Sequence, residues 1–342
     1  MGLAIKDLLI IKDLELKDLS NKIVAVDSFN LLYQFLTTIR SRDGTPLMDS
    51  SGNVTSHLVG LLSRTSKLLE YNIKPVFVFD GKPPKLKQDE RERRKDLKVE
   101  AQKKYEIAVK KEDIEEMRKY ASMTTRLTPE LIQDAKTLIE CLGLPIVQAP
   151  SEGEAQASYI AKNNDAFAVI SQDFDSLLYG STNLVRNLSI LGKRKRTNKL
   201  QYHIIQPELI NLSENLNNLN IDQNQMIALA ILIGTDYNHG GVKGIGPKNA
   251  LKLVRENGSD FDKLFSGVDW KFDIPWEEIY YTIKKMPVEK DYDLKFNKID
   301  ENRLKSFLVD KHDFSEERID SQIKKLIKKK EDKSQKGLGD FV

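Results

Sequence analysis

Three short apolar runs of the sequence end in acidic residues, and these acids are the first candidates for chemistry. The runs Ile23–Val26, Val76–Phe79 and Phe167–Ile170 are continuous and consist mainly of β-branched and aromatic residues. Runs of this kind are typical of buried parallel strands. Further acids follow at the start of a predicted helix and in a later loop. The seven candidates are Asp27, Asp80, Glu152, Glu154, Asp173, Asp175 and Asp236.

These acids would suit a site for divalent metal ions. Carboxylates that gather at one edge of a sheet repel each other unless cations neutralise them. Oxygen ligands suit Mg²⁺ or Mn²⁺, whereas four His and the single Cys141 serve zinc poorly. Two such cations about 3.5–4 Å apart would suit phosphodiester hydrolysis, because together they activate water and stabilise the attacking and leaving oxygens.

Each acid taken alone also has a purely structural explanation. Asp is common after strands because it suits turns. The pattern Ser151-x-x-Glu154 fits a helix-capping box, and Asp236 fits a turn at the end of a helix. The joint pattern of three strand ends, one helix start and one loop favours the metal site.

The elements that must position these acids indicate an α/β fold. Apolar residues recur at helical spacing over 29–39 and 58–69, between the first two runs. The sequence therefore predicts a mostly parallel central sheet with helices on both faces. Ligands of such sheets bind at the carboxyl ends of the strands, where three of the runs carry their acids.

The composition is that of a folded protein without membrane spans. The chain has 342 residues, of which 40% are hydrophobic, and one Cys, which excludes a disulfide scaffold. The longest apolar run, Met226–Ile233, is too short to cross a bilayer, and no signal peptide is visible. We expect a cytoplasmic protein, or a nuclear one if the source is a eukaryote.

One segment is strongly basic and has few apolar residues. Residues 82–111 hold twelve Lys or Arg and six Asp or Glu, a net charge of +6, and predict a long exposed helix. Lys87 and Arg94 are seven residues apart and would share one helix face. The alternative is an ordinary solvated face with pairs such as Glu90–Arg94.

A glycine-rich segment, 240–248, suits contact with phosphate. Pro247 fits the first turn of a helix. The glycines before it, Gly244 and Gly246 among them, let backbone N–H groups approach an anion at the helix N-terminus. A tight structural turn is the alternative.

At this point several blocks closely resemble the flap endonucleases, a family of structure-specific 5′-nucleases of replication and repair. The blocks are Val-Asp27-Ser, Phe-Asp80-Gly-Lys-Pro-Pro, Ser-Glu152-Gly-Glu154-Ala, Gln-Asp173-Phe-Asp175 and Gly-Thr-Asp236-Tyr-Asn, with Gly-Val-Lys-Gly-Ile-Gly-Pro-Lys after the last. The similarity covers nearly the whole chain, and its short C-terminus is similar to archaeal members. It implies cleavage of 5′ flaps at the junction of single and double strand, with a minor 5′–3′ exonuclease activity.

The resemblance also implies the roles of the acids and cations. Two Mg²⁺ ions, for which Mn²⁺ could substitute, would bind the acids: Asp27, Asp80, Glu152 and Glu154 at one centre, and Asp173, Asp175 and Asp236 at the other. Residues 82–132 would form a helical arch over the active site. Lys87 and Arg94 of the arch would reach the scissile phosphate as catalytic residues.

For DNA binding, the resemblance implies two further regions. Tyr33 would stack on a base next to the cut, and Arg40 and Arg64 would meet template-strand phosphates. A partly buried core tyrosine and two surface arginines are the alternatives. Residues 226–256 would form a helix–two-turn–helix that holds duplex DNA through Gly244, Gly246 and Lys248, with a bound K⁺.

The C-terminal end is similar to a sliding-clamp-binding peptide. We expect a single nuclease domain over 1–325, a monomer by itself, and a flexible tail over 326–342. The tail carries the spacing Gln-x-x-Leu-x-x-Phe-Val through Gln335, Leu338, Phe341 and Val342.

The basic run Lys193–Arg196 is predicted to be a loop and matches no part of the family pattern.

Two other functions compete with a flap endonuclease. A Mg²⁺-dependent phosphohydrolase of small molecules would need neither the basic arch nor the glycine hairpin. A catalytically silent DNA-binding adaptor on the clamp would be expected to lack carboxylates, yet all seven are present.

Overall fold

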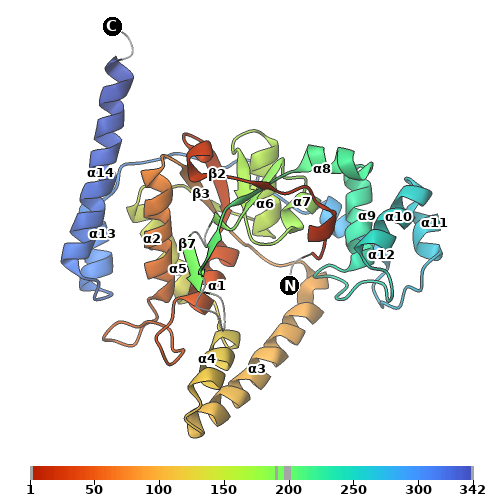
Figure 1. Ribbon diagram of the computed structural model, residues 1–342, viewed down its shortest axis with the longest axis horizontal. Coiled ribbons are helices and arrows are strands. Elements are labelled where there is room, and N and C mark those ends of the chain that lie inside the picture. The colour runs from red at the N-terminus through yellow and green to blue at the C-terminus, as the bar shows by residue number, and fades with distance from the viewer. Residues whose placement is uncertain (1–2, 189–191, 196–201, 340–342) are drawn as a thin grey trace.

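The computed structural model describes residues 3–188, 192–195 and 202–339. A seven-stranded sheet forms the centre of the molecule (Figure 1). Its strands lie in the order β1-β9-β6-β5-β2-β3-β4. Their bounds are Lys12–Asp13 (β1), Ile23–Asp27 (β2), Lys74–Phe79 (β3), Ile146–Gln148 (β4), Ala168–Ile170 (β5), Asn183–Arg186 (β6) and Glu208–Asn211 (β9).

The sheet is mostly parallel, as the sequence predicts. The five strands from β4 to β6 pair in parallel, and β9 pairs antiparallel with both β6 and β1. Side chains alternate between the two faces of β2. Val24 and Val26 join one core cluster, and Ala25 joins another.

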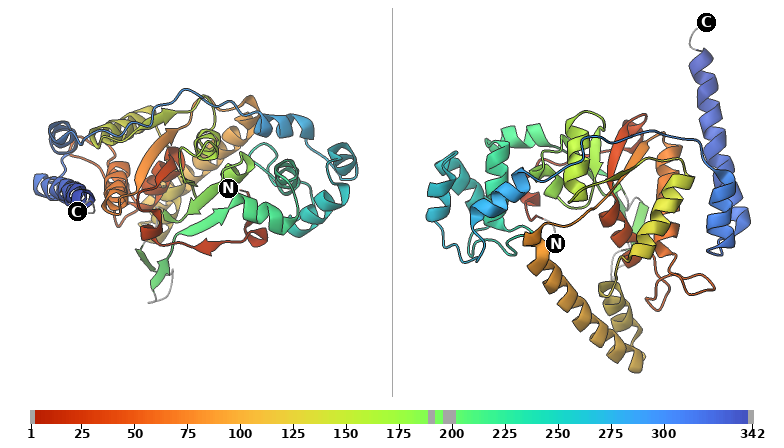
Figure 2. Two further views of the ribbon diagram at one scale, coloured as in Figure 1. Left: turned by 90° about the horizontal axis from the view of Figure 1, so that it is seen from above. Right: turned by 180° about the vertical axis from the view of Figure 1, so that it is seen from behind.

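Helices cover both faces of this sheet (Figures 1 and 2). One face packs against α1, α2, α5 and the C-terminal helices, and the other against α6. The bounds are Ser28–Thr38 (α1), Ser56–Glu70 (α2), Pro129–Cys141 (α5), Gly153–Lys162 (α6), Asp175–Leu178 (α7), Leu212–Leu219 (α8), Gln223–Ile233 (α9), Pro247–Asn257 (α10), Phe261–Ser266 (α11), Trp276–Lys284 (α12), Glu301–Lys305 (α13) and Glu316–Gly339 (α14). Short single turns are Lys6–Leu8 (η1), Leu16–Leu19 (η2), Lys85–Lys87 (η3) and Ser306–Asp310 (η5).

A separate core joins the helices of the predicted DNA-binding element. α9 is buried along most of its length among α7, α10 and α12. Its start is fixed by a capping box in which Asp222 and Gln225 bond each other's backbone N–H groups. The predicted helical pair over 226–256 corresponds to α9 and α10.

The predicted arch is a helical hairpin that projects from the body (Figures 1 and 2). It consists of α3, which spans Gln88–Lys110, and α4, which spans Ile114–Met123. Asp113 ends the turn between them, and its carboxylate accepts the N–H of Glu116 at 3.0 Å. Only three residues of α3 are buried, so this basic helix is exposed as expected.

Three local predictions are wrong. The sequence over 207–256 predicts helices with one glycine-rich break, but Glu208–Asn211 form β9, because tertiary pairing with β6 overrides local propensity. Lys193–Lys195 of the predicted basic loop lie in strand β7 (Gly192–Lys195), which pairs with β8 (Tyr202–Ile205), whereas Arg196 lies outside the described residues.

The third correction concerns the C-terminal tail. Residues 326–339 are helical rather than irregular, since they continue α14. Ile319 and Ile323 anchor the first turns of this helix in the core, and the following Lys, Glu and Gln residues are strong helix formers. No helix in the described part of the chain has the length and apolar character to cross a membrane.

Candidate active site

The strand order places three of the predicted acids at one edge of the sheet. β3, β2 and β5 are adjacent and parallel, so their carboxyl ends lie together. Asp27 is the last residue of β2, Asp80 directly follows β3, and Asp173 lies in the loop after β5.

The remaining acids come from segments that pack on this edge. Glu152 is the N-cap residue of α6, and Glu154 lies in its first turn. Asp175 begins α7, and Asp236 lies in the loop after α9. Glu154 interacts electrostatically with Asp175 and Asp27, and Asp175 also interacts with Asp236. The structure thus brings the predicted acids into one network.

Burial and mutual repulsion raise the pKa of four of these acids. Burial, followed by the charge of Asp80, raises the pKa of Asp27 to about 8. Burial raises the pKa of Asp175 to about 7 and the pKa of Asp80 to about 6, with a neighbouring carboxylate as the next cause in each case. Burial also raises the pKa of Glu154 well above its ordinary value. A nearby cation would relieve this repulsion.

Two polar residues that the sequence analysis missed hold the acids in place. Asn30 donates its side-chain amide to Asp173 Oδ2 at 2.8 Å and its backbone N–H to Asp27 Oδ1 at 3.1 Å. The Ser171 hydroxyl lies 2.8 Å from Glu154 Oε1 and 3.3 Å from Asp27 Oδ2. Asn30 and Asp173 are 143 residues apart, so no local sequence pattern could have shown this contact.

Gly153 lets Asp80 approach the start of α6. Its backbone N–H donates to Asp80 Oδ1 at 2.7 Å. A Cβ at this position would clash with the same oxygen. A glycine between the two glutamates is therefore required by the position of Asp80.

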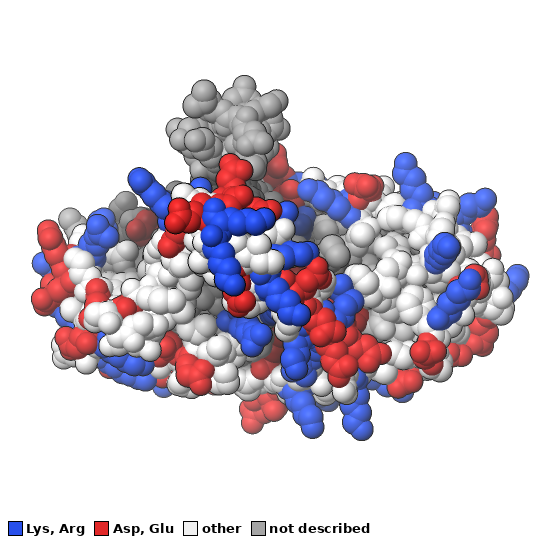
Figure 3. All heavy atoms as spheres, turned by 90° about the horizontal axis from the view of Figure 1, so that it is seen from below, with Lys and Arg blue, Asp and Glu red and all other residues white. Residues whose placement is uncertain are grey.

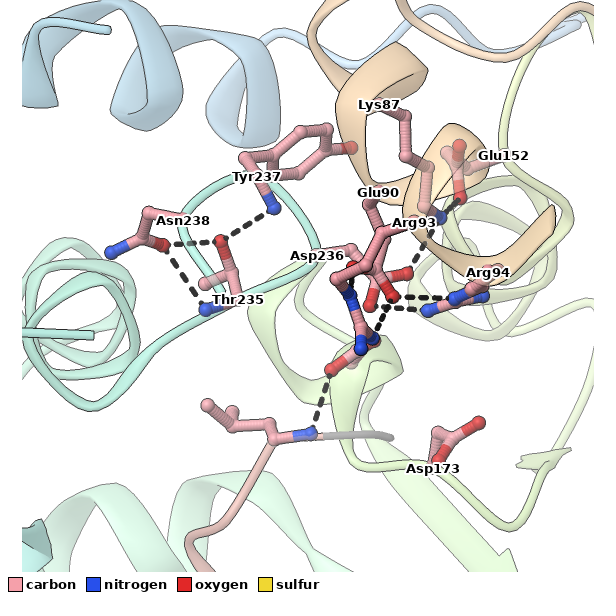
Figure 4. Close-up of polar contacts among 12 residues, drawn as sticks. Lys87, Glu90, Arg93, Arg94, Glu152, Asp173, Thr235, Asp236, Tyr237 and Asn238 are labelled. Atoms are coloured by element: carbon pink, nitrogen blue, oxygen red, sulfur yellow. Dashed lines mark hydrogen bonds and ion pairs between the residues drawn. The ribbon is translucent and has the colours of Figure 1, made fainter. Parts of the chain in front are cut away.

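The base of the arch brings two cations to the acids (Figure 4). Lys87 Nζ lies 2.6 Å from Glu152 Oε2 and 3.1 Å from Asp236 Oδ2. The Arg94 guanidinium donates to Asp236 Oδ1 at 2.7 Å. Burial alone lowers the pKa of Lys87, but the two carboxylates outweigh it and raise that pKa above its ordinary value. Lys87, at the end of η3, and Arg94, on α3, thus meet at one carboxylate.

Glu90 is a third residue of the arch base that the sequence analysis did not single out as functional. It accepts hydrogen bonds from the side chains of both Arg93 and Arg94. Burial alone would raise the pKa of Glu90, but these two arginines lower it to about 2.

The surface on the side of the arch is not of a single charge. Figure 3 shows Lys and Arg side chains interleaved with Asp and Glu across this face. The pair Glu100–Lys104 on α3, with 2.6 Å between the charged atoms, is one of the exposed pairs. The excess positive charge of the segment is therefore distributed among ion pairs, and the cations at the arch base are distinguished by what they contact.

The donor chemistry of this edge fits hard divalent cations, although the acids do not form a closed ligand set. In the described part of the chain, no three acidic, His or Cys side chains converge tightly enough to hold a metal ion. Lys87 and Arg94 already neutralise part of the cluster, whereas Asp27 and Glu154 interact mainly with other carboxylates. Carboxylate oxygens of this kind suit Mg²⁺ or Mn²⁺.

The loop that carries Asp236 is fixed by its own polar contacts (Figure 4). The Asn238 side chain donates to the Ile231 carbonyl at 2.7 Å. Its oxygen accepts the Thr235 backbone N–H at 3.0 Å and the Thr235 hydroxyl at 2.7 Å. These bonds tie the loop back to the end of α9, which positions Asp236.

The predicted phosphate-binding glycines lie on an open side of the hairpin between α9 and α10. Gly244 has a φ of +82°, in the left-handed region. At Gly244 and Gly246 an added Cβ would meet no atom within 4 Å. Gly246 is the N-cap residue of α10, Pro247 is its first residue, and Lys248 is exposed beside them. This geometry leaves room for an anion at the helix N-terminus.

Tyr33 and Arg64 lie on α1 and α2, two of the helices that pack on the sheet. Tyr33 on α1 is 36% exposed, and Lys98 Nζ of the arch lies 5.2 Å from the centre of its ring. Arg64 on α2 is partly buried, and burial lowers its pKa from the ordinary value. Tyr33 is therefore available as a stacking surface, whereas Arg64 is less accessible than a surface arginine.

Arg40 has structural contacts that the sequence did not predict. Its guanidinium donates to the Leu36 carbonyl at 2.8 Å, the Gly44 carbonyl at 2.7 Å and Thr125 Oγ1 at 2.5 Å. These bonds tie the end of α1 to the following loop and to the segment after α4. A phosphate would have to compete with them.

The predicted clamp-binding motif lies at the limit of the structure. Gln335 and Leu338 fall within α14, of which only the backbone is described at these positions. Phe341 and Val342 lie outside the described residues.

Comparison with known proteins places this constellation in a family. The XPG N-terminal domain matches residues 2–101, and the XPG I-region matches residues 143–236. Flap endonuclease 1 of Hyperthermus butylicus is 51% identical over 333 residues, which cover 96% of this chain and 95% of that protein. Flap endonuclease 1 of Pyrococcus furiosus is 49% identical over 332 residues, with 96% and 95% covered.

Solved structures agree with this relationship. The structure of flap endonuclease-1 from Methanococcus jannaschii has a TM-score of 0.75 and 43% identity, covering 97% of this chain and all of that one. The catalytic core of Rad2 in complex with a DNA substrate has a TM-score of 0.69 and 25% identity, covering 95% and 100%. The strand-end acids, the arch and the glycine hairpin thus belong to a known architecture, and the chain is a member of the flap endonuclease family.

Proposed function

We propose that the chain is a metal-dependent, structure-specific 5′-flap endonuclease with a lesser 5′–3′ exonuclease activity, acting in DNA replication and repair. The observation that carries the proposal is the meeting of Lys87 and Arg94 with Asp236 at the acidic edge of the sheet. Family membership supports the DNA substrate and the dependence on metal.

We further propose that two Mg²⁺ ions bind at this edge, with Mn²⁺ as a substitute. Asp27, Asp80, Glu152 and Glu154 would hold one, and Asp173, Asp175 and Asp236 would hold the other. When bound, such ions activate water and stabilise charge on the oxygens of the phosphodiester. For Glu152 and Asp236 to bind metal, the ammonium of Lys87 has to leave them, and the scissile phosphate is the natural new partner for it.

The protein's own residues would then orient the DNA around the cut. Lys87 and Arg94 would donate hydrogen bonds to the scissile phosphate and offset the charge that grows on it. Tyr33 would stack on the neighbouring base. Gly244, Gly246 and Lys248 would hold a phosphate of the duplex, with K⁺ bound in the hairpin.

A single assay tests this function against its rivals. The substrates are a labelled duplex with a 5′ flap, the blunt duplex of the same sequence, and a small phosphomonoester. We expect cutting at the flap junction with Mg²⁺, weak shortening of the blunt duplex, and no reaction with a chelator. Hydrolysis of the phosphomonoester alone would indicate a small-molecule phosphohydrolase, and binding of the flap without cutting would indicate a silent adaptor.

We also propose one catalytic domain over residues 1–325 and a clamp-binding tail over 326–342. The domain boundary is supported by core contacts of Leu304, Ile319 and Ile323 with the helices on the sheet. One copy of the chain supplies both the acids and the arch cations, so a monomer would suffice for cleavage.

The tail would bind a sliding clamp through its last eight residues. Leu338 and Phe341 are three apart, so one helical turn places them on one face for an apolar pocket. Gln335 would bond a neighbouring site. For a short peptide segment of this kind we expect a dissociation constant around micromolar.

Titration calorimetry against the clamp tests the tail. Deleting residues 335–342 should abolish binding, and Phe341→Ala should weaken it by about 2 kcal/mol. Cleavage without clamp is the control for the deletion, because the segment holds none of the seven acids. Equal clamp affinity of the full and shortened chains would contradict the assignment.

A further inference from the structure

Glu90 is buried on a helix that is otherwise almost entirely exposed. It is 5% exposed, and the other buried residues of α3 are two alanines, Ala101 and Ala108. Burying a carboxylate is costly unless it is paired and hydrogen-bonded. Glu90 therefore has a role that its neighbours on the exposed face of α3 do not share.

The burial of Glu90 comes from docking of the arch base against two other segments. A cavity of about 280 Å³ beside it is lined by residues of α3, of the loop at Asp236 and of the segment 271–274. Leu86 and Phe272 contribute apolar surface to this cavity. Glu90 thus lies where the arch meets the body of the protein.

The carboxylate of Glu90 holds two arginines on the same helix. Arg93 donates to both of its oxygens, at 2.6 and 2.8 Å. Arg94 donates through Nε to Oε1 at 2.5 Å, while a terminal nitrogen of the same guanidinium donates to Asp236 Oδ1 at 2.7 Å. Arg94 is therefore fixed between two acids from different elements (Figure 4).

This geometry leaves part of the Arg94 guanidinium available. The group has five N–H donors in a rigid planar fork, and the two bonds above use one donor of Nε and one of a terminal nitrogen. Because the fork is planar, fixing Nε to Glu90 and one terminal nitrogen to Asp236 sets the direction of the remaining donors. A lysine at position 94 could not be oriented in this way.

We propose that Glu90 is a positioning residue that orients the Arg94 guanidinium for the substrate phosphate at the acidic edge. The inference rests on the role proposed above for Arg94 and names the group that makes that role possible. It differs from a simple helix-stabilising pair, which would affect folding of the arch and leave the cleavage step unaltered.

The test is a double-variant cycle on single-turnover cleavage of the 5′-flap duplex, with Mg²⁺ and saturating enzyme. Glu90→Gln keeps the size of the side chain and removes the charge that holds Arg94. We expect it to slow the cleavage step about tenfold or more, because misplacing a catalytic group costs rate even when binding survives. The dissociation constant for flap DNA, measured with Ca²⁺, should change less than about threefold.

The decisive measurement is the same change in an Arg94→Ala background. If Glu90 acts through Arg94, Glu90→Gln should cost less than about twofold there. Glu100→Gln is the matched control, since Glu100 is an exposed acid of α3 that forms an ion pair with Lys104 on the same helix. It should leave the rate of each background, wild-type or Arg94→Ala, unchanged.

Three outcomes would overturn the inference. Wild-type cleavage by Glu90→Gln would do so, as would an equal loss in both backgrounds, which indicates a role in folding. Wild-type cleavage by Arg94→Ala would remove the proposed role of Arg94 as well, so the two failures are distinguishable. If circular dichroism shows that Glu90→Gln unfolds the arch, Glu90→Asp, which keeps the charge on a shorter stem, replaces it in the cycle with the same criteria.

Discussion

The acids at the edge of the sheet and the cations at the arch base are held by opposite kinds of interaction. Asp27 and Asp80 lie at the ends of central strands and are kept close to other carboxylates despite their repulsion, as their raised pKa values show. Lys87 lies in η3 at the start of the arch and Arg94 lies on α3, and both are held by attraction to acids. The carboxylates at the sheet edge therefore repel one another, and the cations of the arch base offset part of that repulsion.

This difference has a consequence for function. The strand-end acids are fixed by the sheet, whereas Lys87 and Arg94 contact the acids through side-chain ion pairs. Under the proposed function, a substrate phosphate and metal ions would take over these contacts. The following predictions would break or sharpen this contrast.

The largest effect is expected from removing a carboxylate charge at the edge of the sheet. Asp80→Asn and Asp173→Asn should each lower the cleavage rate on the order of 10³-fold or more, as expected for loss of a preorganised stabiliser of the transition state. Binding of flap DNA should persist. Single-turnover rates and DNA dissociation constants are the measurements.

A matched control is Glu317→Gln, which removes an exposed acid of α14 far from the sheet edge in sequence. It should cut at the wild-type rate. Near-normal cleavage by both Asp80→Asn and Asp173→Asn at saturating Mg²⁺ would remove the acids from the mechanism.

A smaller loss is expected from removing a cation of the arch base. Lys87→Ala and Arg94→Ala should each lower kcat about 10²-fold, with far less change in DNA affinity. The physical reason is that each cation acts on charge that develops only during cleavage. A change confined to KM, with preserved single-turnover rates, would make them ordinary phosphate contacts.

The same contrast explains which features could be predicted from the sequence. The acids were predictable because each strand-end run is local, and parallel strands necessarily bring their carboxyl ends to one edge. Helical spacing predicts a shared face for Lys87 and Arg94, whereas their role at the scissile phosphate is implied only by the family resemblance. In both cases a short pattern determines the placement.

Other features depend on distant partners, and the sequence did not show them. Asn30 becomes a support of the site only because β5 lies beside β2, and Glu90 is buried only because the arch docks on other loops. Similarly, Glu208–Asn211 form a strand because β6 offers an edge to pair with. Arg40 has the residue type of a phosphate contact, but three acceptors around it give it a structural role.

The repulsion between the buried carboxylates predicts how the free energy of unfolding depends on pH in the absence of metal. The pKa of Asp27 is raised to about 8 and the pKa of Asp175 to about 7 in the folded chain, so the folded state binds more protons than the unfolded state above the ordinary pKa. The contribution of these two groups to stability is therefore fully present below the ordinary pKa of Asp. It is lost as the pH rises through their raised pKa values in the folded chain. With a chelator, we expect a loss on the order of 2 kcal/mol between pH 6.5 and 8.5.

The buried His57 does not oppose this loss of stability between pH 6.5 and 8.5. Burial lowers the pKa of His57 to about 4, which costs stability only below the ordinary histidine pKa of about 6.5. Chemical denaturation at several pH values measures the slope. Asp27→Asn should flatten it while still capping α1, since Asn is as good an N-cap as Asp. A wild-type slope in this variant, or no recovery of stability on adding Mg²⁺ at pH 8.5, would contradict the repulsion.

The smallest effect is expected at the contact between Tyr33 of α1 and Lys98 of the arch, which is not an ion pair. Tyr33 lies on α1, which starts from the acidic edge, and Lys98 of the arch lies over its ring. If the ring serves as a stacking surface for a base, Tyr33→Ala should weaken productive binding by about 1 kcal/mol, roughly fivefold. Tyr33→Phe should lose less, because it keeps the aromatic face.

Lys98→Met separates stacking from anchoring of the arch, since it removes the cation and leaves the ring. If stacking dominates, Lys98→Met should cost clearly less than Tyr33→Ala in flap affinity and cleavage. Equal losses in the two variants would mean that the ring acts by holding the arch through Lys98, and not as a stacking surface for a base.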